Sequence, residues 1–252
     1  MDDSMYNGFA EVYDRLMADA PYQAWKDAVI QETPGKSVKM LELGCGTGEI
    51  MKHLYGEGFR VDGMDLSADM LAVAAQKWGL SDEKPVLFHQ DMRVLEAPDT
   101  YQLIYCFCDS LNYLTAPEDV KNTFAGVYSH LEAEGVFMFD VHSIHYIEDI
   151  LAEVSFADND EEISFIWDVY PSEQNWEVEH ELTIFSKNID GTYNRYDEDH
   201  VQRTFAINEY KEWLEEAGFS NIRITADFTA DFPNEQSERI FFVAKKQTNG
   251  VK

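Results

Sequence analysis

Residues 38–50, VKMLELGCGTGEI, decide the fold of this chain. The apolar run at residues 38–43 is long enough for a buried strand and too short for a free-standing helix. Three glycines at alternate positions, beginning with Gly44, then allow a sharp turn with positive φ angles. They also remove the Cβ atoms, so a ligand can lie directly against the main chain. A helix expected from about Thr47 points its free N–H groups into the same space.

The spacing of these glycines distinguishes between classes of nucleotide-binding loop. A dinucleotide fingerprint, Gly-x-Gly-x-x-Gly, needs a glycine where this chain has Glu49, and the Gly-Lys-Ser/Thr of a Walker A loop does not follow. Instead Glu42 stands two positions before the three alternating glycines. This pattern closely resembles motif I of the class I S-adenosylmethionine (SAM)-dependent methyltransferases. A glycine-rich turn in another Rossmann-like domain is the alternative at this point.

Two further acidic residues stand where expected strands end. Asp65 lies about 20 residues beyond the glycines, where a carboxylate accepts hydrogen bonds from the ribose hydroxyls. Ser67 can cap the next helix in its place. The resemblance implies the same role for Asp65 and places Leu66 beside the ribose or adenine. It also implies that Asp91 receives the adenine amino group and that the Met92 N–H reaches a ring nitrogen, although Asp91 could equally cap the segment after it.

The fourth expected strand, residues 101–107, is nearly all apolar and therefore buried on both faces. Ligands in doubly wound sheets bind beyond the carboxyl ends of the strands, so the next residues line the expected site. They are Cys108, Asp109, Ser110, Asn112 and Tyr113. This segment corresponds by position to motif IV of the family. It lacks both the Asp/Asn-Pro-Pro-Tyr of nucleic-acid amino methyltransferases and the Pro-Cys of pyrimidine C5 methyltransferases.

The N-terminal residues 6–17, YNGFAEVYDRLM, carry helical spacing and are followed by PYQAW at residues 21–25. A packing helix accounts for most of the apolar stripe. The two segments together resemble the N-terminal arm of small-molecule methyltransferases, especially the bacterial group called YqeM-type. In related enzymes this arm folds over the cofactor, which implies a position for Tyr13 near the methionine end of SAM. We take residues 1–34 as this arm.

The pattern of the chain changes at residues 155–204. Residues 163–170, 176–186 and 193–205 alternate apolar and polar side chains, and Asp190-Gly191 is a hairpin signal, so we expect an antiparallel insertion. The insertion can be a lid that shapes a substrate pocket, or a small sheet packed on the core or on a dimer partner. Near its end, Arg203 is a candidate to orient a substrate anion or to pair with a carboxylate.

Strands and helices alternate on either side of this insertion, at residues 35–154 and 205–247. The expected fold is α/β, a Rossmann-like doubly wound sheet with the N-terminal helical arm and the β insertion. Residues 221–228 and 239–245 predict a final reversed hairpin. A seven-stranded sheet with its last strand antiparallel is typical of class I methyltransferases and absent from ordinary dinucleotide folds.

The amino-acid composition disfavours nucleic acids and anionic membranes as binding partners. The 252 residues include 48 acidic and 19 basic side chains, a net charge of −29, which repels nucleic-acid phosphates and anionic membranes. Neither a signal peptide nor an apolar run of membrane-spanning length is visible. The three cysteines are odd in number and lack the Cys-x-x-Cys spacing, which favours a reduced cytoplasmic protein without a metal site.

The sequence therefore predicts a methyltransferase that moves a methyl group from SAM to a small-molecule acceptor and releases S-adenosylhomocysteine (SAH). Positioning carries much of such a reaction, and a base is needed only when the nucleophile must lose a proton. The catalytic candidates are Tyr13, Asp109, His142 and His200. The cofactor-binding candidates are Tyr13, Glu42, Gly44, Cys45, Gly46, Asp65, Leu66, Asp91, Met92 and Cys108.

Three other functions stay open from the sequence: an RNA methyltransferase, a nicotinamide oxidoreductase, and a SAM-binding protein without catalysis. The sequence also leaves open whether oxygen, nitrogen or carbon receives the methyl group, and whether the chain forms a homodimer.

Overall fold

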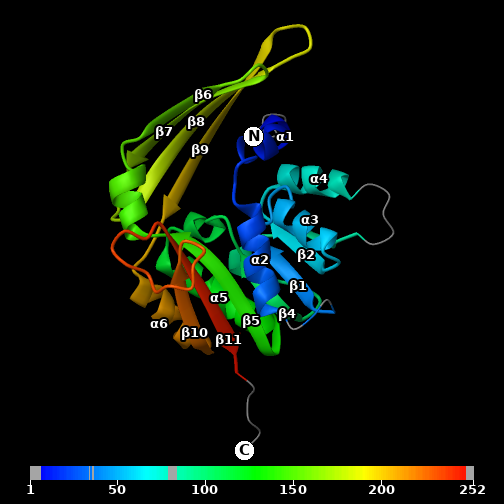
Figure 1. Cartoon of the computed structure of the whole chain (residues 1–252), viewed down its shortest axis with the longest axis vertical. Helices are drawn as coiled ribbons and strands as arrows, with labels where there is room; N and C mark the ends of the chain where they lie inside the picture. Colours follow the sequence, from blue (N-terminus) through cyan, green and yellow to red (C-terminus); the bar gives the residue numbers. More distant parts are fainter. Residues whose placement is uncertain (1–6, 34, 36, 79–83, 248–252) are drawn as a thin grey trace, which may run out of the picture.

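The computed structural model describes residues 7–33, 35, 37–78 and 84–247, and contains a seven-stranded sheet and a separate four-stranded sheet (Figure 1). The larger sheet has the strand order β10-β11-β5-β4-β1-β2-β3. Its strands are β1 (Lys39–Leu43), β2 (Arg60–Asp65), β3 (Leu87–His89), β4 (Tyr101–Cys106), β5 (Leu131–His142), β10 (Phe219–Ala226) and β11 (Arg239–Lys246). The first five pair in parallel, and β11 runs antiparallel between β5 and β10. This confirms the predicted fold class.

Two apolar cores lie on opposite faces of this sheet because side chains alternate along each strand. Leu41 and Leu43 of β1 pack into the core that contains the buried side chains of α5 and α6. Met40, between them, packs into the core that contains those of α2 and α3. The helices of the main domain are α2 (Tyr22–Glu32), α3 (Glu49–Gly56), α4 (Ala68–Lys77), α5 (Pro117–His130) and α6 (Ile207–Ala217).

The four-stranded sheet is the antiparallel insertion, and Figure 1 shows it projecting away from the larger sheet. A short π-helix, Tyr146–Leu151, leads into it. Its strands, in the order β6-β7-β8-β9, are β6 (Ser155–Asn159), β7 (Ile163–Pro171), β8 (Glu177–Lys187) and β9 (Tyr193–Arg203). The sequence pattern does not predict β6, because all five of its residues are exposed and no apolar alternation marks it.

One face of the insertion is directed toward the rest of the molecule. We call this the inner face. It carries Val178, His180, Leu182 and Ile184 of β8 and Tyr196, Glu198, His200 and Gln202 of β9, which are buried or half-buried, whereas most intervening residues are exposed. The predicted alternation of the insertion is therefore confirmed.

Helix α1 (Asn7–Leu16) joins the insertion to the main domain. Phe9 and Val12 pack against Ile163 and Ile184 of the insertion. On the other side, the Thr47 hydroxyl of the glycine loop donates a hydrogen bond to the Asp14 carboxylate of α1. The arm thus contacts both the insertion and the glycine loop, and its position over a bound cofactor stays a prediction. Tyr6, which belongs to the arm motif, lies outside the described residues.

Some predicted boundaries are wrong by a few residues. The helix expected from Thr47 begins at Glu49, because Gly48 at its N-cap is left-handed, with φ of 77°. The strand expected at residues 221–228 spans Phe219–Ala226. Among the described residues, no helix is long and apolar enough to cross a membrane.

Candidate active site

The glycine loop that follows β1 is built for close approach. Gly44, Gly46 and Gly48 all have positive φ angles, of 65°, 51° and 77°. A Cβ on Gly44 would lie 2.7 Å from the Cβ of Ser110, so only glycine fits there. A Cβ on Gly46 would instead meet nothing within 4 Å. The main chain at Gly46 therefore borders open space, which fits a ligand lying against the loop.

Asp65, at the end of β2, is fixed at the edge of this loop. Its carboxylate accepts hydrogen bonds from the Gly46 N–H at 2.7 Å and the Ser67 N–H at 2.8 Å. Burial raises the pKa of Asp65. Ser67 accepts from the Met70 N–H and so caps α4, which frees Asp65 from that role. Leu66, next to it, is 65% exposed, as expected of an apolar side chain that covers a ligand.

Glu42 and Cys45 lie below the loop in the protein interior. The Tyr105 hydroxyl donates to the Glu42 carboxylate at 3.0 Å, and burial raises the pKa of Glu42 to about 8. Burial likewise raises the pKa of the Cys45 thiol. Both groups are therefore neutral in large part at pH 7 and can form part of the floor of the site without an unpaired charge.

Asp91 follows β3, and its carboxylate is occupied by a neighbour. It accepts from the backbone N–H of Arg93 at 2.9 Å, which caps the short helix Met92–Val94, and from the Arg93 guanidinium. The hydrogen bond from Arg93 lowers the pKa of Asp91. The capping alternative is therefore present in the structure, and the adenine-binding roles of Asp91 and Met92 stay predictions.

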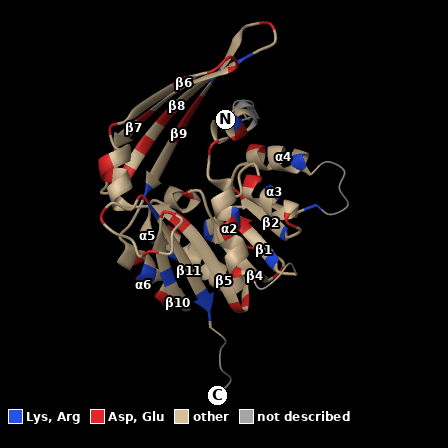
Figure 2. Ribbon diagram, viewed as in Figure 1, with Lys and Arg blue, Asp and Glu red and all other residues tan. Residues whose placement is uncertain are grey.

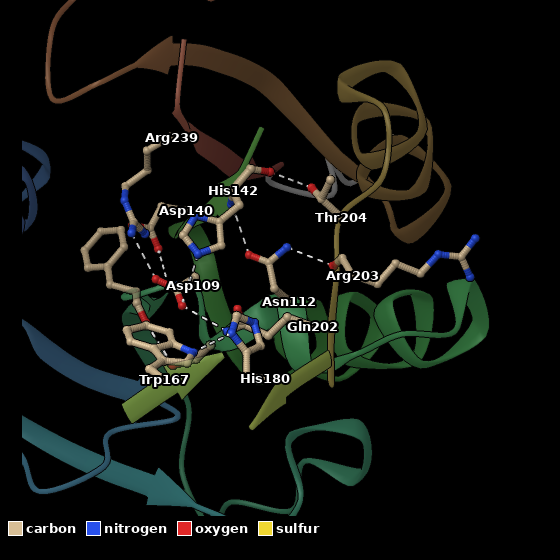
Figure 3. Close-up of polar contacts among 12 residues, drawn as sticks. Asp109, Asn112, Asp140, His142, Trp167, His180, Gln202, Arg203, Thr204 and Arg239 are labelled. Atoms are coloured by element: carbon tan, nitrogen blue, oxygen red, sulfur yellow. Dashed lines mark hydrogen bonds and ion pairs between the residues drawn. The ribbon is translucent and has the colours of Figure 1, made fainter. Parts of the chain in front are cut away.

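The turn after β4, residues 108–113, holds an aspartate in a dense polar network (Figure 3). Cys108 and Asp109 both have positive φ angles, 56° and 51°, which are uncommon for residues other than glycine. Asp109 accepts from Arg239 at 2.9 Å and from Gln202 at 3.0 Å, and it lies 3.4 Å from His142 Nε2. Burial opposes its charge, but His142 and Arg239 hold the pKa of Asp109 well below its usual range.

Arg239, the first residue of β11, connects Asp109 to a second buried carboxylate. Its guanidinium donates to Asp140 at 2.7 Å, and Asp140 also accepts from the Trp25 indole N–H at 2.8 Å. Asp109 is thus a stably charged, compensated group. Because its pKa is low, it orients its neighbours better than it accepts a proton from a substrate.

His142 is held at the end of β5 by its backbone and by its ring. Its backbone N–H donates to the Asn112 side-chain oxygen at 3.0 Å, and its backbone carbonyl accepts from the Thr204 hydroxyl at 2.6 Å. Its ring stacks on that of Tyr146, with 4.5 Å between the ring centres. Next to it is a cavity of about 380 Å³, a size suited to a small molecule. The lining residues are His142, Tyr146, Asp227, Phe228, Gln236, Glu238 and Arg239.

The other catalytic candidates converge on the same region. Burial raises the pKa of Tyr13, whose ring packs edge-on against Phe9 at 5.7 Å, and Phe9 in turn lies 6.1 Å from His200. The His200 ring lies 5.8 Å from that of Tyr113. The structure therefore brings the arm, the turn after β4 and the inner face of the insertion together.

Arg203 is held by backbone carbonyl oxygens, and its role toward a substrate anion stays a prediction. Its guanidinium donates to the carbonyl oxygens of Asn175 at 3.2 Å and Thr115 at 3.0 Å, and it lies over the Phe205 ring. Figure 3 shows the side chain extending away from Asp109. The expectation that Arg203 pairs with a carboxylate is wrong, because carbonyl oxygens take its hydrogen bonds.

Four residues of this region are missing from the sequence-based candidates: Asp140, His180, Glu198 and Arg239. Only an indirect signal marks them. His180 and Glu198 fall on the buried side of alternating strands, and Arg239 is the one basic residue at the start of a strongly apolar final strand.

Comparisons with known proteins agree with this geometry. Residues 40–135 match the family described as a methyltransferase domain. The chain is 46% identical over 245 residues to a putative methyltransferase of Geobacillus sp. strain WCH70, covering 96% of this chain and 99% of that protein. It is 45% identical over 244 residues to the putative methyltransferase YqeM of Bacillus subtilis strain 168, covering 96% and 97%.

Among solved structures, a SAM-dependent methyltransferase from Clostridium acetobutylicum superposes with a TM-score of 0.85 at 29% identity, over 96% of this chain and 99% of that one. The fold, the glycine loop and these matches define a SAM-dependent methyltransferase, and SAM is its cofactor. Within this class the chain belongs to the YqeM-type family, as its N-terminal arm predicts.

Proposed function

We propose that this enzyme methylates a small-molecule acceptor held between α1, residues 108–113 and the inner face of the insertion. The observation that carries the proposal is the position of α1. Asp14 contacts the glycine loop, and Phe9 contacts the insertion, so the arm spans the space above the site. We take the acceptor between these elements to be a small molecule rather than a folded RNA.

Charge also supports a small acceptor that is not a nucleic acid. Acidic residues outnumber basic ones 48 to 19, and Figure 2 shows few Lys and Arg positions on the insertion. Nucleic-acid binding depends on phosphate neutralisation by such residues. The three cysteines are free, in keeping with a reducing cytoplasm.

Two more distant relatives have names that specify small acceptors. They are the glycine/sarcosine N-methyltransferase of Halorhodospira halochloris, 24% identical over 254 residues, and the dTDP-3-amino-3,6-dideoxy-alpha-D-glucopyranose N,N-dimethyltransferase of Streptomyces fradiae, 27% identical over 138 residues. Both act on amines, but their acceptors differ greatly in size and charge.

The residues of the site take the following roles in the proposal. The main chain at Gly46 and the Asp65 carboxylate hold the adenosyl group, which brings an already activated methyl group when SAM is bound. The enzyme then has to align the acceptor with it, and this alignment supplies much of the rate. Tyr13 keeps its proton at neutral pH, since its pKa is raised, and acts as a hydrogen-bond donor.

Where the acceptor must lose a proton, a histidine takes it. Burial lowers the pKa of His200, so this ring is neutral and able to accept a proton at pH 7. His142 is oriented by Asp109 and is the second candidate. Asp109 itself is a poor base for the reason given above.

The test is a transfer assay with SAM that carries a labelled methyl group, run on a bacterial small-metabolite extract and separately on total RNA. We expect label in the small-metabolite fraction, and no transfer by a His142→Ala, His200→Ala double variant to an acceptor that must lose a proton. Label in RNA alone would overturn the proposal.

A further inference from the structure

The inner face of the insertion carries a carboxylate without a counter-charge. Glu198 of β9 lies between Tyr196 and His200 on this face and is only 9% exposed. None of the described residues donates a hydrogen bond or an ion pair to it. Burial and the neighbouring Asp199 raise the pKa of Glu198 to about 6, so it is mostly charged at pH 7. The carboxylate is largely but not fully removed from water, so a cationic group of a ligand can reach it and offset the cost of its burial.

A second unpaired group lies one strand away on the same face. Trp167 Nε1 donates to His180 Nδ1 at 3.0 Å, so the neutral His180 ring carries its proton on Nε2. This nitrogen is buried and makes no hydrogen bond to the described residues; the Gln202 side chain lies beside it and donates its amide N–H to Asp109. Burial lowers the pKa of His180 to about 4, so the ring stays neutral.

The positions of the two groups are set by the pairing of the strands. His180 is the cross-strand neighbour of His200, and Glu198 is two residues before His200 on β9. Such diagonal neighbours are roughly 7–8 Å apart on an antiparallel pair. The inner face thus presents an acceptor of protons or cations and a hydrogen-bond donor at a separation that one small molecule can span.

The cations nearest to this face are already bound. Arg239 is shared by Asp109 and Asp140, and Arg203 is bound to carbonyl oxygens. Aromatic rings complete the surroundings: His200 lies 5.8 Å from Tyr113 and 6.1 Å from Phe9. A phosphate or carboxylate group on the acceptor would therefore meet no free positive charge at this face from the part of the chain that the structure describes, whereas an ammonium group meets both a carboxylate and aromatic rings.

We propose that Glu198 binds an ammonium group of the acceptor and that His180 Nε2–H binds a hydroxyl or carbonyl oxygen of the same molecule. The proposal rests on the proposed function, because it places the acceptor between the same elements. The acceptor class is an unphosphorylated small amine that bears an oxygen several bonds from its nitrogen. This excludes nucleotide-linked acceptors, which carry a diphosphate.

The test is calorimetry on the SAH-bound enzyme with matched probes. Each amine is compared with its hydroxyl counterpart: ethanolamine with ethylene glycol, 4-amino-1-butanol with 1,4-butanediol, and D-glucosamine with D-glucose. D-Glucosamine 6-phosphate is the anionic probe. We expect at least one amine to bind tenfold or more tightly than its counterpart, and the phosphate to weaken binding.

Variants separate the roles of the two residues. In Glu198→Gln the ratio of amine affinity to hydroxyl-counterpart affinity should fall at least tenfold. Glu179 is exposed on the outer face of β8, so Glu179→Gln should leave this ratio unchanged. His180→Phe should weaken 4-amino-1-butanol but leave n-butylamine unchanged. SAH affinity should stay the same in all three variants.

Three results would overturn the assignment: no amine preferred over its counterpart, preferential binding of the phosphorylated probe, or unchanged amine binding in Glu198→Gln. Failure of the proposed function appears separately, as methyl transfer that goes only to RNA.

Discussion

The glycine loop and the inner face of the insertion are the proposed cofactor side and acceptor side of one site, and they are assembled differently. At the loop, Gly46 and Asp65 are 19 positions apart and share a hydrogen bond. Gly46 follows β1 and Asp65 ends β2, and these two strands are neighbours in the sheet. On the insertion side, Gln202 reaches Asp109 across 93 positions, and Arg239 reaches it across 130. The cofactor side is therefore a local motif. The acceptor side exists only once distant parts of the chain have packed together, and this difference determines which mutations affect stability and which affect binding.

The largest expected effect is on stability, at Arg239. Arg239→Met leaves Asp109 and Asp140 buried without their shared cation, and breaking a buried pair in this way costs about 3–5 kcal/mol. Urea unfolding measures the loss. Adding Asp140→Asn to this variant should recover part of it. A change below about 1 kcal/mol would mean that the acceptor side does not depend on this long-range contact.

The next largest effect is on cofactor affinity, at Asp65. Asp65→Ala removes a carboxylate expected to accept two hydrogen bonds from the ribose, each worth about 1.5–3 kcal/mol, so SAM should bind at least a hundredfold more weakly. Calorimetry gives the affinity, and circular dichroism checks that the fold is intact. Unchanged SAM affinity would show that Asp65 does not bind the ribose. The contrast between a local cofactor side and a long-range acceptor side would then fail as well.

The stability of the fold should depend on pH through Glu42, the buried carboxyl group below the glycine loop. The pKa of Glu42 is raised to about 8 when folded, so between pH 4.5 and 8 the native state holds a proton that the unfolded chain releases. Stability should therefore fall as pH rises through this window, by up to about 1.4 kcal/mol per pH unit from this group. Other groups titrate there too, among them His180 with the opposite sign.

The difference between wild type and Glu42→Gln at each pH isolates the Glu42 contribution. We expect the variant to lose less stability than wild type between pH 5 and 8. Parallel curves would show that Glu42 is ionised in the folded protein throughout this range.

The smallest effect is expected at the exposed contact between arm and insertion. Arg15 pairs with Glu162 at 2.6 Å, but both side chains are largely exposed, and such pairs contribute little. Arg15→Ala should leave both the melting temperature and the SAM affinity unchanged. A clear loss of affinity would show that this ion pair, rather than the apolar packing of Phe9 and Val12, holds the arm over the site.

These contrasts also explain what could be predicted from the sequence. The alternating glycines and Asp65 were recognisable because turn geometry and strand ends dictate residue type over a short stretch. The reversed hairpin and the alternating strands of the insertion follow from periodicity. Strand β6 could not be predicted, since exposed residues on an edge strand need no apolar pattern.

The acceptor side was predicted only in part. Alternation places Glu198 on the same face as His200, but it does not indicate which side chains cover that face. No sequence pattern pairs Arg239 with Asp109, or Trp167 with His180, because these contacts depend on how two sheets and a helix pack. Asp109 itself was predicted from its place after β4, while its charge state follows from partners far away in the chain.

The most direct test of the account is a crystal structure of the enzyme with SAH. We predict the adenosyl group against Gly46 and Asp65, with the sulfur facing the space between Tyr13, residues 108–113 and the inner face of the insertion. A sulfur atom directed away from the insertion would contradict the account, because the groups assigned to the acceptor could not then meet the methyl group.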